Sequence, residues 1–70
     1  MTWFVQYSIG ETAGLCTGAT LAKAIAQACD LIDEGAIVSQ INTPAGAVGA
    51  TASEITIACA RRKAMRNQLH

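Results

Sequence analysis

Apolar and polar residues alternate with a period of two at the start of the chain. The apolar positions are Trp3, Val5, Tyr7 and Ile9. This alternation predicts a strand over 2–9 with one strongly apolar face, and it places Phe4 on the other face. Residues 10–12 have turn chemistry, and 14–18 predict a short second strand in a hairpin, weakened by its glycines.

A helical period follows. Apolar residues recur at 21, 24, 25, 28, 31 and 32, while charged and amide side chains occupy the opposite side. This spacing predicts a helix over 21–34, with Thr20 as its N-cap and Gly35 as the left-handed residue that ends it. A separate strip of this helix carries small side chains that would let another backbone approach closely, and we interpret it as a candidate contact surface. The strip consists of Ala19, Ala22, Ala26 and Cys29.

The segment 36–42 predicts a third strand because it is rich in β-branched residues. Strict alternation would place Ile37 and Ile41 on one side and Val38 on the other, so that Phe4 and Val38 could mark an exposed apolar patch. The sequence Thr-Pro-Ala-Gly at 43–46 suits a type I turn. A brief strand over 47–50 would then close a hairpin at the edge of the sheet.

The C-terminal segment allows two interpretations. Thr51 and Glu54 have the spacing of a capping box, which favours a helix to about Gln68. The β-branched run at 55–57 would instead suit a strand over 54–59. We favour the helix, because a strand there would leave 61–70 as a short isolated helix of marginal stability.

These elements define one α+β domain over residues 1–70. We expect a sheet of three to four strands in the order β-β-α-β-(β)-α, with the first helix packed across it and a second helix at the C-terminus.

The core of such a domain is expected to be thin. Apolar residues make up 51% of the chain, but many are alanines, which remove little area from water. Small domains of this kind are commonly stabilised by disulfides, a metal ion or a partner subunit. The three cysteines, Cys16, Cys29 and Cys59, are odd in number and widely spaced, so we expect them to be reduced and buried, which favours the cytoplasm. No secretory pattern opens the chain, and the charge-free stretch 35–53 contains too many polar residues for a membrane span.

Positive charge is concentrated near the C-terminus. The formal net charge is zero, yet four of the five basic residues are Arg61, Arg62, Lys63 and Arg66. On a helix these residues could contact phosphates of a nucleic acid or another anion. The neutral domain and the absence of interleaved aromatic residues make this the second choice.

Residues for catalysis or metal binding are not grouped in the sequence. The single histidine, His70, is the last residue and a poor general base or ligand. The acidic residues at 30, 33 and 34 are better interpreted as solvated, and the glycine-containing segment 44–51 lacks the lysine of a phosphate-binding loop. We therefore expect no enzyme activity, no cofactor and no metal site.

The central segment ATLAKAIAQACDLIDEGAIVSQINTPAG ends a helix in an acidic residue and glycine, continues as a strand and then turns at Pro-x-Gly. In this it resembles many short bacterial α+β proteins of unknown function. The resemblance implies the order of the elements and assigns no functional residue.

The function expected from these observations is a noncatalytic, self-associating interaction domain, most simply a homodimer. Nucleic-acid or anion binding through the basic helix is the alternative. The candidate contact residues are Phe4, Ala22, Ala26, Cys29, Ile57 and Met65.

Overall fold

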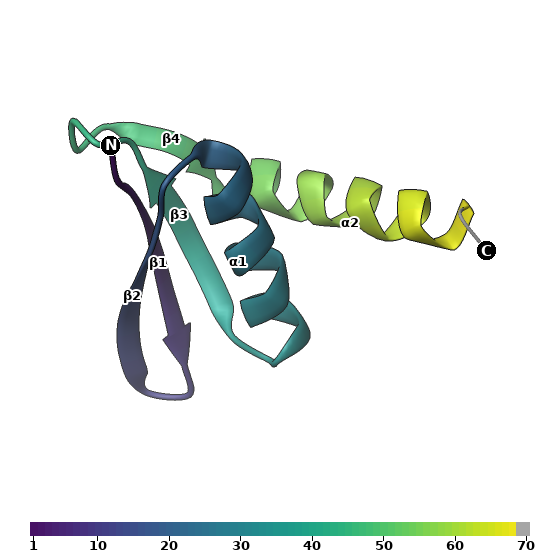
Figure 1. The fold of residues 1–70 in the computed structure, drawn as a ribbon. Helices are drawn as coiled ribbons and strands as arrows, with labels where there is room; N and C mark the ends of the chain where they lie inside the picture. The colour runs from purple at the N-terminus through teal and green to yellow at the C-terminus, as the bar shows by residue number, and fades with distance from the viewer. Residues whose placement is uncertain (69–70) are drawn as a thin grey trace.

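The computed structural model describes the backbone of residues 1–68 and the side chains of residues 1–65. It contains four strands and two helices (Figure 1). They are β1 (Trp3–Ile9), β2 (Thr12–Gly18), α1 (Leu21–Asp33), β3 (Ile37–Asn42), β4 (Val48–Thr51) and α2 (Ala52–Gln68). The α+β class and the order β-β-α-β-β-α are confirmed.

The four strands form one open antiparallel sheet in the order β2-β1-β3-β4. Because β2 and β3 both run antiparallel to β1, they are parallel to each other, and α1 connects them by crossing over β1. The helix packs against β1, β2 and β3, while α2 packs against α1, β3 and β4. One face of the sheet is therefore covered, and the strands β2 and β4 form its two edges.

The β1–β2 hairpin is closed by the two residues Gly10 and Glu11. Ile9 pairs with Thr12, and Gly10 has a φ of 59° while Glu11 does not have a positive φ, which matches a type II′ turn. The strand β2 is longer than the predicted 14–18. Its two glycines do not interrupt it. A Cβ atom at Gly18 would lie 2.8 Å from the backbone nitrogen of Ala24, and a Cβ atom at Gly14 would lie against the Tyr7 ring.

A β-bulge in β3 changes which residues face the core. Gln40 pairs with Gln6 and Val38 pairs with Tyr7, so Ser39 is an extra residue with no partner in β1. An inserted residue of this kind resets the alternation of the strand.

The expected faces of β3 were therefore wrong in part. Val38 and Ile41 are both buried, at 6% and 0% exposure, although they differ in parity, and Ile37 is 71% exposed. Val38 does not share an exposed patch with Phe4, which is half-buried on the other face of the sheet.

The predicted N-terminal caps of both helices are present, and so is the glycine predicted to end α1. The Thr20 hydroxyl oxygen accepts a hydrogen bond from the Lys23 amide at 3.2 Å, and Gly35 has a φ of 97° directly after the C-cap residue Glu34. At the start of α2, the Glu54 amide donates to the Thr51 hydroxyl and the Thr51 amide donates to the Glu54 carboxylate, both at 3.3 Å. Residues 54–59 are thus helical, as favoured from the capping box.

The core lies between the sheet and the two helices and is small. Among residues 1–65, the largest side chains that are fully buried are Val5, Ile41 and Ile55. Alanines and cysteines provide most of the remaining buried apolar residues, with Trp3, Tyr7, Leu21 and others packed around them.

Candidate interaction surfaces

A disulfide joins the two helices. Cys29 of α1 is bonded to Cys59 of α2, with 5.4 Å between their Cα atoms. The expectation of reduced cysteines was therefore wrong for this pair. The two residues are 30 positions apart in the chain, and only the packing of α2 beside α1 brings them together. The apolar faces of both helices were visible in the sequence, but their mutual position was not.

The disulfide also changes the role of the small-residue strip on α1. The close approach that we expected at Cys29 is made by α2 of the same chain, so Cys29 is buried and is not a contact for a second molecule. Ala26 is half-buried, and Ala22 stays exposed. The strip therefore offers only its N-terminal part to a partner.

On the face of the sheet that points away from the core, the described residues place no helix and no charged side chain. We call it the open face, and it consists of Phe4, Gln6, Ser8, Ala13, Leu15, Thr17, Ile37, Ser39, Gln40, Asn42, Val48 and Thr51. Its most exposed apolar side chains are those of Leu15 at 58%, Ile37 at 71% and Val48 at 55%. Apolar groups mixed with hydroxyls and amides are typical of surfaces that contact other proteins.

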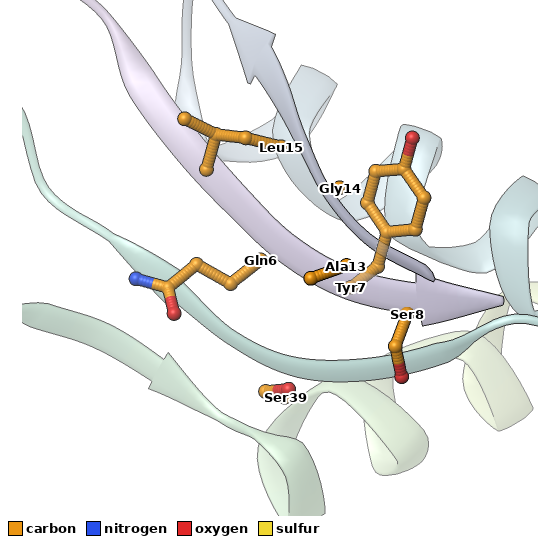
Figure 2. A pocket seen from close by; sticks show the side chains of 7 residues that line it. All are labelled: Gln6, Tyr7, Ser8, Ala13, Gly14, Leu15 and Ser39. Atoms are coloured by element: carbon orange, nitrogen blue, oxygen red, sulfur yellow. The ribbon is translucent and has the colours of Figure 1, made fainter. Parts of the chain in front are cut away.

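A shallow depression of about 470 Å³ lies at the open face beside β2. Figure 2 shows the side chains of Gln6, Ser8 and Ser39 around it, and its lining continues to Leu15 on β2. The amide of Gln6 and the hydroxyls of Ser8 and Ser39 can donate and accept hydrogen bonds, but these three side chains do not pair a nucleophile with a general base.

Tyr7 lies on the core side of β1 and extends over β2. A Cβ atom at Gly14 would collide with the Tyr7 ring, so the absence of a side chain at Gly14 is what allows the ring to lie there. The hydrogen bond of the phenol to Cys16, the negative charge of Cys16 in its thiolate form and some desolvation raise the pKa of Tyr7 above its ordinary 10.0. Cys16 itself is half-buried and is not part of a disulfide.

The basic residues of α2 have different surroundings in the structure. Arg61 and Arg62 are exposed, but the Lys63 ammonium lies 3.2 Å from the Asp33 carboxylate at the end of α1. Both members of this ion pair are largely solvated, at 61% and 43% exposure. Arg66 lies on α2, and its side chain is outside the described residues, as is His70.

The two predicted contact residues of α2 are both exposed. Ile57 is 54% exposed and Met65 is 66% exposed. The C-terminal half of α2 extends away from the sheet, as Figure 1 shows. Between the helices, a groove of about 230 Å³ is lined by Ile32, Asp33, Thr56, Cys59, Ala60 and Lys63.

Among the residues that the structure describes, no helix is long and apolar enough to cross a membrane. No group of three or more histidine, cysteine, aspartate or glutamate side chains in that part of the chain is arranged to hold a metal ion. Comparison with protein-family models, with curated proteins and with solved structures found no match.

Proposed function

We propose that this protein is a noncatalytic interaction domain that acts as a homodimer. One observation carries the proposal: among the side chains that the structure describes, three large apolar ones are fully buried, while seven large apolar ones are exposed. The exposed residues are Met1, Ile9, Leu15, Ile37, Val48, Ile57 and Met65. A small domain gains stability when a second subunit covers part of such a surface.

Solution mass across a concentration series is the direct test. Light scattering or sedimentation is expected to give a mass close to twice the 7.3 kDa of the chain at micromolar concentration, falling on dilution. A constant mass of one chain, together with full thermal stability, would count against self-association.

Nucleic-acid or anion binding is a second candidate, supported by the exposure of Arg61 and Arg62 on the projecting helix. Binding to DNA and RNA at two salt concentrations tests it, because phosphate contacts weaken steeply with salt. An Arg61→Ala/Arg62→Ala variant should lose binding, while Lys23→Ala, which removes a positive charge near the N-terminus of α1, should keep it. Equal binding by both variants would exclude this role for the arginines.

The location of the protein is linked to the disulfide. Disulfides persist in oxidising compartments and are rare in the cytoplasm, so the Cys29–Cys59 bond favours an oxidising compartment over the cytoplasm expected from sequence. Counting free thiols after rapid acid quenching of cells tests this: one thiol per chain supports the oxidised form, and three support the cytoplasm.

A further inference from the structure

The strand β2 presents a free backbone edge. In a two-residue hairpin the residues that flank the turn exchange both backbone hydrogen bonds, and hydrogen-bonded pairs then recur at every second position. With Ile9 paired to Thr12, the inward-bonded residues of β2 are 12, 14, 16 and 18. The N–H and C=O groups of Ala13, Leu15 and Thr17 therefore point away from the sheet.

These six backbone groups have no backbone partner in the turns, loops and caps of the described residues. In Figure 1 the free edge of β2 lies on the side of the sheet away from α2. Natural edges are usually protected by charge, proline, a bulge or short length. The strand β2 has seven residues and none of these devices, whereas the other edge, β4, has four residues and a bulge in its pairing.

We propose that β2 pairs antiparallel with β2 of a second copy, about a two-fold axis that passes beside Leu15. The proposal rests on the self-association proposed above and names its surface. The axis places Ala13 opposite the partner's Thr17 and Leu15 opposite the partner's Leu15. All six outward groups of each strand then form hydrogen bonds, and the two sheets join into one of eight strands.

Other registers satisfy fewer groups. A shift by two residues keeps the outward groups facing each other but leaves one of the three outward residues of each strand beyond the pairing. A shift by one residue places outward groups against inward-bonded ones. The symmetric register is thus the one that pairs the whole edge.

The side chains fit this register on both faces. On the open face the two copies of Leu15, each 58% exposed in the single chain, lie directly opposite one another. On the helix side, Gly14 lies opposite the partner's Cys16, so only small groups meet there. The Tyr7 ring, which already lies over Gly14, is close to this junction.

Charge complementarity at the two ends of the β2–β2 pairing favours a second copy of this chain as the partner of the β2 edge. The register places Glu11, in the hairpin turn, opposite the partner's Ala19, which immediately precedes the N-cap of α1. That helix has no acidic residue in its first turn, and Lys23 has no ion pair in the described part of the chain. A carboxylate near a helix N-terminus is stabilising, and the symmetry makes this contact twice.

The experiment compares Leu15→Lys with the matched control Ile37→Lys. Both replace an exposed apolar residue of the open face by lysine, but only the former puts two like charges opposite each other at the axis. We expect the dimer dissociation constant to rise roughly tenfold or more for Leu15→Lys and to change little for Ile37→Lys. A dimer that is equally stable in both variants would overturn the proposal.

Amide hydrogen exchange provides a second readout on the unmodified protein. The amides of Ala13, Leu15 and Thr17 should be protected at high protein concentration and exposed on dilution, while those of Gly14 and Cys16 stay protected throughout. Unprotected amides at 13, 15 and 17 in a protein that is dimeric by mass would reject the β2 edge while leaving self-association intact. A monomeric mass at all concentrations would reject both proposals.

The register itself is tested by a charge exchange. Glu11→Lys should weaken the dimer, because it places a positive charge near the N-terminal turn of the partner's α1, which carries Lys23. Adding Lys23→Glu in the same chain should restore the dimer, because this turn approaches residue 11 only across the proposed interface. Loss without restoration would overturn the symmetric register.

Discussion

Gly18 and Gly14 both lie on the helix-facing side of β2, but their surroundings differ in rigidity. A Cβ atom at Gly18 would lie 2.8 Å from the backbone nitrogen of Ala24, in the first turn of α1. A Cβ atom at Gly14 would meet the end of the Tyr7 side chain, which can rotate away. A backbone inside a packed helix cannot move without disturbing the core.

We expect Gly18→Ala to lower the free energy of unfolding by about 1–3 kcal/mol, as overpacking does elsewhere, and Gly14→Ala to cost less. Urea denaturation of the two variants measures both values. If Gly18→Ala were as stable as the parent protein, the close packing of α1 on β2 would be wrong.

The raised pKa of Tyr7 predicts how the stability of the fold depends on pH and how the phenol titrates when Cys16 is replaced. Since the folded protein holds the phenolic proton more tightly than the unfolded chain does, this group stabilises the fold below the unfolded pKa of 10.0, and the stabilisation is lost as the pH rises through the folded pKa. In Cys16→Ala the pKa should fall back toward 10.0 because the hydrogen bond and the charge are removed. Ultraviolet titration of the phenolate resolves this, as Tyr7 is the single tyrosine. An unchanged titration curve would show that Cys16 does not act on Tyr7.

At the scale of elements, the disulfide supports the attachment of α2. The helix buries Ile55 and Cys59, but much of its remaining surface is exposed. A cross-link between residues separated by 30 positions restricts the unfolded chain, which stabilises the fold by about 3–4 kcal/mol in the chain-entropy treatment. For a domain of this size that is a large part of the total stability.

Removing the cross-link should therefore be costly. We expect Cys29→Ser/Cys59→Ser to lower the free energy of unfolding by about 2–5 kcal/mol, while Cys16→Ser, which leaves the bond intact, costs far less. Thermal denaturation monitored by circular dichroism compares the variants. Equal stability of the double variant and the parent protein would show that packing alone holds α2.

At the scale of the whole molecule, folding and association are coupled if the small core is completed by a partner. A ligand that binds only the folded state raises its apparent stability with concentration, and a second copy is such a ligand. We expect the melting temperature of the parent protein to rise with protein concentration and that of Leu15→Lys to stay nearly constant. Scanning calorimetry over a hundredfold concentration range measures both. A parent protein with no concentration dependence would contradict the coupling.

The local elements were determined by the sequence alone. The alternation that includes Val5 and Tyr7, the capping residues Thr20 and Thr51, and the glycine at 35 act through neighbours within a few positions, so strands, helix ends and the α+β order could be predicted from them.

Features that depend on distant segments were decided by the tertiary structure. The bulge at Ser39 places Val38 in the core because β3 must match β1, and alternation within β3 could not reveal it. The Cys29–Cys59 bond requires α2 to lie beside α1, a relation that sequence spacing does not contain. The free edge of β2 likewise depends on β3 pairing with the other side of β1, because the order of strands in a sheet is fixed by packing across the whole domain.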